Sequence, residues 1–227
     1  MRQTQQVNSA DGITRRPLKS RGTKWAAAVA AVLARAGIRP NVISVAGAGF
    51  AAGAGFCFWV AGSRAHDWKW SVLLILAVCG MQFRLLCNLF DGMVAIEGGF
   101  KTKAGEIFNE LPDRFSDVFI FIGAGYSLPE FEWTVTLGWA AAVLSVITAY
   151  ARALGASMGA GQHFLGPMAK QHRMATMTAA CGLGAFAPLW PKLSNAIPLA
   201  LGLVAAGCVV TIYRRCRRIA LQMESQK

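Results

Sequence analysis

The sequence predicts an all-α integral membrane protein in which an amphipathic interfacial helix precedes six transmembrane helices. Hydrophobic residues make up 55% of the 227 residues and charged residues only 15%, whereas soluble domains carry about a quarter charged residues. The apolar residues gather in segments of the roughly 20 residues that a helix needs to cross a bilayer. Basic residues are concentrated in alternate loops, which is the distribution that membrane insertion imposes.

The elements follow in order along the chain. We expect a polar tail at residues 1–16, an interfacial helix at 17–39, a six-span domain at 40–213 and a basic tail at 214–227. The segment 17–39 carries an apolar stripe at helical spacing, with basic residues on both sides of it along the chain. This pattern is typical of a helix at the membrane interface. The stripe consists of Trp25, Val29, Val32 and Leu33. The alternative is that this segment begins the first span. The spans are predicted at residues 41–62, 70–96, 105–126, 133–155, 174–190 and 196–213.

The first span carries a pair of glycines that favours close helix packing. Gly49 and Gly53 form a G-x-x-x-G spacing, which lets another helix backbone approach closely. Packing within the chain is the ordinary explanation of such a pair, and a homodimer through the same face is the alternative.

The net charge of +12 has two interpretations, nucleic-acid binding or a positive cytoplasmic surface against anionic membrane lipid. The hydropathy favours membrane lipid and argues against nucleic acid. Eight basic residues precede the first span and five follow the last, whereas the predicted outer loops hold only Arg64, Lys69 and Lys192. Both termini are therefore expected in the cytoplasm, in a bacterial inner membrane, with the end of the second span and the beginning of the third, and any site that they carry, at the cytoplasmic face.

Acidic residues mark the most informative stretch of the chain. Only 11 Asp and Glu residues occur in the whole sequence. Six of them fall in the window 88–117, beside strongly apolar sequence: Glu97 in the loop, and the five candidates Asp91, Glu106, Glu110, Asp113 and Asp117. Acids next to a membrane span are costly, so they indicate an ion, proton or substrate site.

Helical spacing gathers oxygen-bearing side chains on two facing helices. Asn88 and Asp91 are three residues apart, and Asn109 and Asp113 are four apart, so each pair shares a helix face. Two antiparallel helices would bring the faces together as a cluster of hard oxygen ligands, which suits Mg²⁺ or Mn²⁺ and, through the metal, phosphate oxygens. Gly92 and Gly105 flank the cluster and would let a nucleotide approach the backbone. One carboxylate would accept the proton of an attacking alcohol.

This stretch resembles the CDP-alcohol phosphotransferases, a family of integral membrane enzymes with the pattern D-x-x-D-G-x-x-A-R, eight residues, then G-x-x-x-D-x-x-x-D. The register holds throughout, at Asn88, Asp91-Gly92, Ala95-Ile96, Gly105, Asn109 and Asp113. Pro40-Asn41 before the first span and Tyr150-Ala151-Arg152 at the end of the fourth are also similar to the family. The resemblance covers nearly the whole chain and implies the fold of an interfacial helix followed by six spans.

The resemblance assigns roles residue by residue. It implies metal ligation at Asn88, Asp91, Asn109 and Asp113, with Asp113 also the catalytic base. It implies nucleotide contacts at Asn41, Asp91, Gly92, Ala95 and Gly105. The chain departs from the pattern at Ile96 and at the two asparagines, which offer only neutral carbonyl ligands and place the chain in a divergent subgroup. Three acids could compensate for the lost charge: Glu106, Glu110 and Asp117.

Basic residues near the ends of the fourth and fifth spans are candidates for binding a phosphate or the acceptor. They are Arg152, Lys170 and Arg173. A guanidinium or ammonium group pairs well with phosphate oxygens. For Lys170 and Arg173 the alternative is ordinary anchoring of the membrane protein by cytoplasmic basic residues. Arg152 has the additional support of the family pattern.

The resemblance predicts transfer of a phosphatidyl, or other substituted phosphoryl, group from a CDP-linked lipid to an alcohol acceptor, with release of CMP, in phospholipid biosynthesis. CDP-diacylglycerol is the expected donor because the site opens at the membrane interface. Two other functions stay open. One is a catalytically silent member that binds CDP-lipid as a partner subunit. The other is a small membrane transporter with an acidic site, although the sequence lacks an obvious inverted repeat.

Overall fold

A computed structural model describes residues 23–64, 67–100, 105–128, 131–161 and 165–225. The regular elements in these ranges are helices. They are α1 (Lys24–Arg35), α2 (Pro40–Ala61), the 3₁₀ helix η2 (Gly62–Arg64), α3 (Trp68–Glu97), α4 (Gly105–Gly125), α5 (Glu132–Ser157), α6 (Lys170–Gly184), the 3₁₀ helix η3 (Pro191–Asn195) and α7 (Ala196–Glu224). The predicted polar tail at 1–16 lies outside the described residues.

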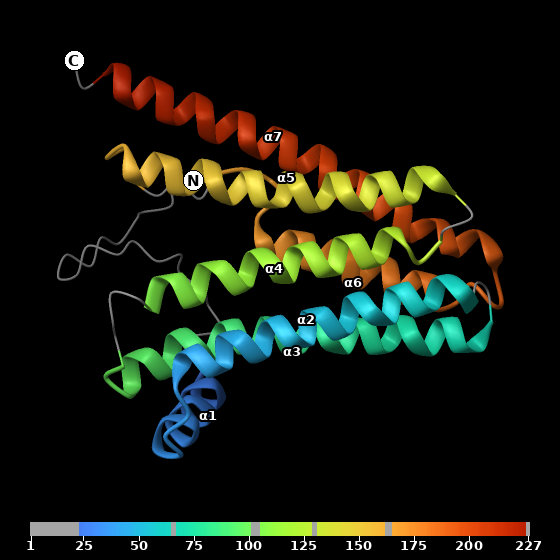
Figure 1. Cartoon of the computed structure of the whole chain (residues 1–227), viewed down its shortest axis with the longest axis horizontal. Helices are drawn as coiled ribbons and strands as arrows, with labels where there is room; N and C mark the ends of the chain where they lie inside the picture. The colour runs from blue at the N-terminus through green and yellow to red at the C-terminus, as the bar shows by residue number, and fades with distance from the viewer. Residues whose placement is uncertain (1–22, 65–66, 101–104, 129–130, 162–164, 226–227) are drawn as a thin grey trace.

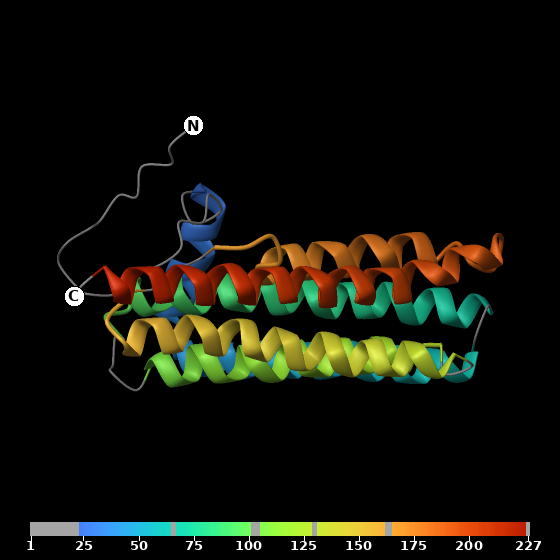
Figure 2. The same ribbon diagram turned by 90° about the horizontal axis from the view of Figure 1, so that it is seen from above.

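The long helices form a bundle of two layers (Figures 1 and 2). One layer contains α2, α4 and α5, and the other contains α3, α6 and α7. The layers are joined by the packing of α2 on α3 and of α5 on α7. The end of α3 and the beginnings of α2 and α4 lie at the same end of the bundle, on the left in Figure 1. This arrangement places the central acidic stretch at one end of the bundle.

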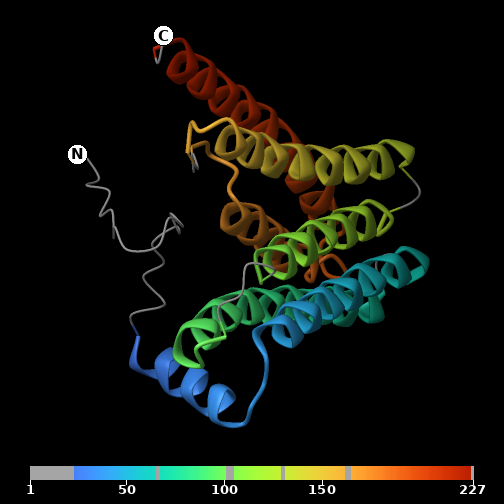
Figure 3. The ribbon, with the colours of Figure 1, turned by 60° about the vertical axis from the view of Figure 1, so that its left-hand side comes forward.

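Helix α1 crosses this end of the bundle and packs against α3 (Figure 3). It buries Ala26 and Ala30 in a small apolar cluster with Leu89 and Met93 of α3. Two residues of the predicted apolar stripe expose much of their surface outward, 52% for Trp25 and 62% for Val32, although the Trp25 ring also meets the ring of Phe90 on α3 edge-on. Membrane insertion of this outward face stays a prediction.

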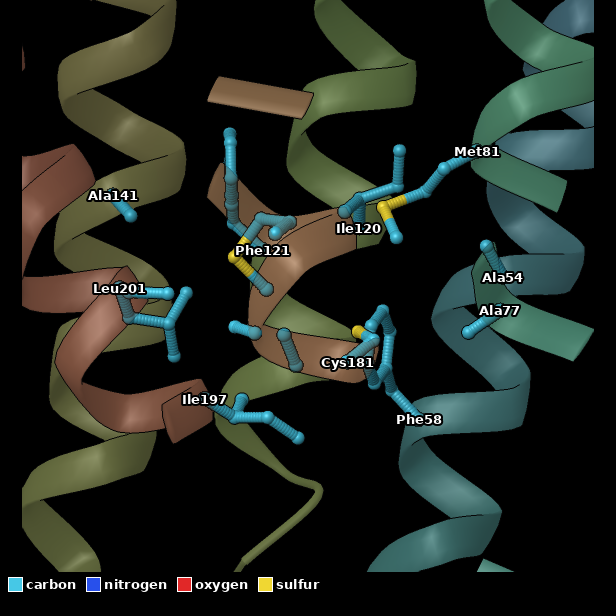
Figure 4. Close-up of a cluster of buried hydrophobic side chains, with 14 of the residues drawn as sticks. Ala54, Phe58, Ala77, Met81, Ile120, Phe121, Ala141, Cys181, Ile197 and Leu201 are labelled. Carbon is cyan, nitrogen blue, oxygen red and sulfur yellow. The ribbon is translucent and has the colours of Figure 1, made fainter. Parts of the chain in front are cut away.

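The main core lies in the middle of the bundle and is built from small and large apolar side chains of six helices (Figure 4). Phe58 of α2, Phe121 of α4 and Leu201 of α7 are among the fully buried members. The cysteines are free thiols.

Glycines bring α2 and α4 into close contact, but not at the predicted pair. A Cβ atom added to Gly123 would lie 2.4 Å from the Gly55 carbonyl oxygen, whereas a Cβ at Gly49 or Gly53 would meet nothing within 4 Å. The prediction of close packing through Gly49 and Gly53 within the chain is therefore wrong. The reason is the direction of the helix face: Gly55 faces the bundle, while Gly49 and Gly53 are exposed.

Four of the six predicted spans are helices long and apolar enough to cross a membrane by length and composition: α2, α3, α5 and α7 with the preceding η3. They support an integral membrane protein. Helix α6 has only 15 residues, and α4 carries several charges in its first half. Six crossings therefore stay a prediction.

Helix α7 also extends beyond its predicted boundary at residue 213. It continues to Glu224 and includes the basic segment that was predicted as a separate tail. Its C-terminal part leaves the bundle on the side opposite α1 (Figures 1 and 3).

Candidate functional site

A small cavity between α2, α3 and α4 collects the motif residues. Its lining comprises Ser44, Gly47, Arg84, Cys87, Asn88, Asp91, Asn109, Pro112, Asp113 and Ser116. All four predicted metal-ligating positions are therefore at one cavity. The i, i+3 spacing on α3 and the i, i+4 spacing on α4 put each pair on one helix face, and the two faces meet.

Helix α2 supplies the third wall, which the motif did not predict. Ser44 is buried, and its hydroxyl donates a hydrogen bond of 2.8 Å to Oδ2 of Asp91. One turn further along, a Cβ at Gly47 would lie 3.1 Å from the Cβ atom of Cys87. The glycine therefore lets α2 approach α3 closely enough for Ser44 to reach the carboxylate.

Three donors surround the carboxylate of Asp113. The amide nitrogen of Asn88 lies 3.4 Å from each Asp113 carboxylate oxygen. The Lys170 ammonium, from the first turn of α6, contacts Oδ2. Nη2 of Arg84 lies 3.5 Å from Oδ1. The predicted base is thus held between an amide and two cations.

Below this cavity, a buried ion network joins α3, α4 and α6. Oδ1 of Asp117 is 3.0 Å from Nη2 of Arg84, and Oδ2 is 2.7 Å from Nη2 of Arg173. The Arg173 guanidinium also donates to the Thr148 hydroxyl of α5 at 3.0 Å. All three charged side chains are at most 4% exposed. Arg173, predicted to bind phosphate, is therefore directed at protein groups here.

Arg152 is likewise paired with an acid. Its Nη2 atom lies 2.6 Å from both carboxylate oxygens of Glu110, whose Oε2 is also 3.0 Å from Nη2 of Arg114. The carboxylates of Glu110 and Asp117 thus form ion pairs with arginines, and neither residue is among the lining residues of the cavity. The side chain of the third predicted compensating acid, Glu106, lies outside the described residues.

The residues predicted to contact the nucleotide are at the helix ends around the cavity. Asn41 is in the first turn of α2, and Gly92 and Ala95 are in the last two turns of α3. Gly105 is the first residue of α4. All four are half-buried. Their contact with a nucleotide stays a prediction.

Two buried arginines have structural roles that the site prediction did not include. Arg84 is one turn before Asn88 on α3, which could have indicated its place beside the motif. Arg215 donates hydrogen bonds to the carbonyl oxygens of Leu165 and Thr148. It is one of several arginines in a basic segment, so only the tertiary fold distinguishes it from its neighbours.

The cavity offers oxygen donors that suit a divalent cation of the Mg²⁺ or Mn²⁺ type. Such ions take oxygen ligands, typically one or two carboxylates completed by water and substrate phosphates. Asp91 and Asp113 supply carboxylates, and Asn88 and Asn109 can supply carbonyl oxygens. Among the described residues, no group of three or more His, Cys, Asp or Glu side chains is placed to hold a metal. These donors would hold an ion through carboxylate and amide oxygens. They do not form a site built from three or more acidic side chains.

Comparison with known proteins identifies the fold. No protein-family model matches the chain. A relative in Escherichia coli K12, the inner membrane protein YnbA, is 26% identical over 151 residues, which are 66% of this chain and 72% of the relative.

Solved structures of phosphatidylinositol phosphate synthase (PgsA1) from Mycobacterium tuberculosis share the fold. The structure with CDP-diacylglycerol bound has a TM-score of 0.73 at 23% identity and covers 87% of this chain and 94% of its own. The complex with manganese and citrate has a TM-score of 0.71 at 23% identity, with 86% and 88% covered. The apo form gives 0.68 at 22% identity, with 85% and 94% covered. PgsA1 is a CDP-alcohol phosphotransferase, so the resemblance seen in the sequence is confirmed as a shared fold.

Proposed function

We propose that this protein is an integral membrane CDP-alcohol phosphotransferase that transfers a phosphatidyl group from a CDP-linked lipid to an alcohol and releases CMP. The observation that carries the proposal is the cavity itself. Asn88, Asp91, Asn109 and Asp113 keep the family spacing in the sequence and line one cavity, in a fold shared with a synthase that binds CDP-diacylglycerol. Among CDP-linked lipids, CDP-diacylglycerol is the proposed donor.

The chemistry assigned to the chain's own groups is proton transfer and positioning. Asp113 accepts the proton of the alcohol, whose oxygen forms a new bond to the lipid-bearing phosphorus. The bond from that phosphorus to the bridging oxygen breaks, and CMP leaves with that oxygen. Asn88 and Lys170 hold the carboxylate in place, and Ser44 holds Asp91. A divalent cation on the oxygen donors would neutralise charge on the diphosphate.

The acceptor is proposed to be a polar alcohol that reaches the cavity from the cytoplasmic end. Arg152 lies near the end of α5 and is 17% exposed, so its pairing with Glu110 is open to competition from an acceptor phosphate. Arg173 pairs with Asp117 in the buried network and would support the site from below. Lys170 is beside the base and is placed to meet charge on either substrate.

The test is release of CMP by the purified protein. CDP-diacylglycerol, Mn²⁺ or Mg²⁺ and a panel of alcohols, including glycerol phosphate and inositol phosphate, are supplied in detergent. Metal-dependent CMP release with one acceptor, together with the matching phospholipid product, supports the proposal. Hydrolysis of CDP-diacylglycerol to CMP and phosphatidate, with no lipid formed from any acceptor, would refute it, and so would the absence of CMP release with every acceptor.

A catalytically silent protein that binds CDP-lipid is the second candidate. The observation in its favour is that two motif aspartates are asparagines and that Asp113 is already paired with Lys170 and Arg84. Such a protein would bind CDP-diacylglycerol with no CMP release. Its binding would be little changed by Asp113→Asn, whereas the transferase would lose turnover.

A further inference from the structure

Two basic side chains lie beside the carboxylate of Asp113. A centre that binds two metal ions would need acidic side chains or free space at these positions. The Lys170 ammonium contacts Oδ2 of Asp113, although the lysine is only 20% exposed and the aspartate 15%. Arg84, 1% exposed, lies 3.5 Å from the other carboxylate oxygen. Removing charged groups from water costs free energy that their attraction to the carboxylate must offset.

Among the described residues, the charged side chains that line the cavity or belong to the ion pairs of Asp113 and Asp117 are three of each sign. The carboxylates are Asp91, Asp113 and Asp117, and the cations are Arg84, Lys170 and Arg173. Asn88 and Asn109 contribute no charge. Two divalent ions would add four positive charges to a neutral set at the edge of a low-dielectric core, where charge repulsion is strong. One divalent ion together with a diphosphate group would leave the set close to balance.

Arg84 also has unused hydrogen-bonding capacity. It lines the cavity, and its buried Nε and Nη1 atoms have no hydrogen-bond partner among the described residues. A buried donor without a partner costs about 1–3 kcal/mol. An anionic oxygen ligand in the cavity, such as a phosphate oxygen, would satisfy these donors.

We propose that the Lys170 ammonium takes the place of a second metal ion beside Asp113, so that the centre binds a single divalent cation. That cation uses Asp91 and the amide carbonyls, while Lys170 and Arg84 neutralise the remaining charge of the diphosphate. The two asparagines and the lysine then form one coupled change. Each asparagine removes an acid that a second metal ion would need, and the lysine supplies positive charge in place of that ion. This inference rests on the proposed transferase function for the identity of its phosphate ligand.

The test counts bound Mn²⁺ on the full-length protein in detergent. The electron paramagnetic resonance signal of free Mn²⁺ is followed during titration, with and without CDP-diacylglycerol. We expect one Mn²⁺ per chain for the wild type. The triple variant Asn88→Asp, Asn109→Asp, Lys170→Met restores acids and removes the ammonium, and we expect two. Lys192→Met, an exposed lysine in η3, is the matched control and should leave the count at one.

A single substitution gives a second measurement if the triple variant does not fold. Lys170→Met alone should tighten Mn²⁺ binding about tenfold, because it removes a positive charge that repels the ion from beside its site. Lys170→Arg keeps the positive charge and should not tighten it. Either substitution is checked for folding by circular dichroism and size-exclusion chromatography.

The inference is overturned by two Mn²⁺ per wild-type chain, by none under either condition, or by a folded triple variant that still binds one. Failure of Lys170→Met to tighten binding would also overturn it. Counting Mn²⁺ does not depend on turnover. A chain that binds one Mn²⁺ and releases no CMP contradicts the transferase proposal alone, and a chain that binds two and releases CMP contradicts this inference alone.

Discussion

Replacing Asp117 by Asn should strongly destabilise the bundle. The substitution preserves the size of the side chain but leaves Arg173 buried without its paired carboxylate and Arg84 with only the more distant carboxylate of Asp113, at 3.5 Å. The carboxylate oxygens lie 3.0 and 2.7 Å from the two guanidinium nitrogens. At an effective dielectric constant of about 20, each pair attracts by roughly 5 kcal/mol, and the desolvation of the ions offsets much of this gain. Loss of one partner from a buried pair costs about 3–5 kcal/mol, and we expect that cost here.

Helix α4 provides a matched control in Glu110→Gln. Glu110 also contacts two arginines, Arg114 and Arg152, but its side chain is 49% exposed. Ion pairs in contact with water contribute about 0–1 kcal/mol, so the control should lower the free energy of unfolding by less than about 1 kcal/mol.

The assay is equilibrium unfolding of both variants in mixed detergent micelles with increasing dodecyl sulfate, followed by circular dichroism and tryptophan fluorescence. A large loss of stability in Asp117→Asn with a small loss in Glu110→Gln is the expected result. Similar losses in the two variants, or a loss below about 1 kcal/mol in Asp117→Asn, would refute the view that burial makes this network essential to the fold.

Three further predictions concern packing, positioning and metal dependence. Gly123→Ala should cost about 1–3 kcal/mol of unfolding free energy, since its Cβ would clash with the Gly55 backbone. Gly53→Ala, where the added Cβ meets no other atom within 4 Å, should leave the free energy of unfolding unchanged. An equal loss of stability in both variants would contradict the close contact between α2 and α4 at Gly55 and Gly123. Ser44→Ala removes the hydrogen bond to Asp91 and should weaken Mn²⁺ binding about tenfold, measured by calorimetry; unchanged affinity would exclude this positioning role. Chelation with EDTA should abolish CMP release and added Mn²⁺ should restore it, whereas full activity in EDTA would remove the metal from the proposed chemistry.

The sequence predicted the helical elements well because their signals are local. Long apolar segments define α2, α3, α5 and α7, and Pro40 at the first turn of α2 marks its beginning. The cavity was also predictable, since i, i+3 and i, i+4 spacing places Asn88, Asp91, Asn109 and Asp113 on facing surfaces. The pairing of these two faces follows from a short connection between antiparallel helices.

The remaining features depend on tertiary contacts that spacing does not encode. Ser44 reaches Asp91 from a helix 47 positions away in the chain, and Lys170 reaches Asp113 from 57 positions away. The helix crossing at Gly55 rather than at Gly49 and Gly53 depends on which face of α2 meets α4. A G-x-x-x-G spacing shows that close packing is allowed, but it does not identify the face that is used.

The most direct test of the account compares CMP release by Asp91→Asn and Asp113→Asn with release by Glu110→Gln. The first two substitutions alter carboxylates that line the cavity, and the third alters an acid of α4 outside its lining. We expect the cavity variants to lose at least about a hundredfold in rate, as removal of a general base or a metal ligand does, while Glu110→Gln keeps most of its activity. Wild-type rates in both cavity variants would contradict the assignment of this cavity as the transferase centre.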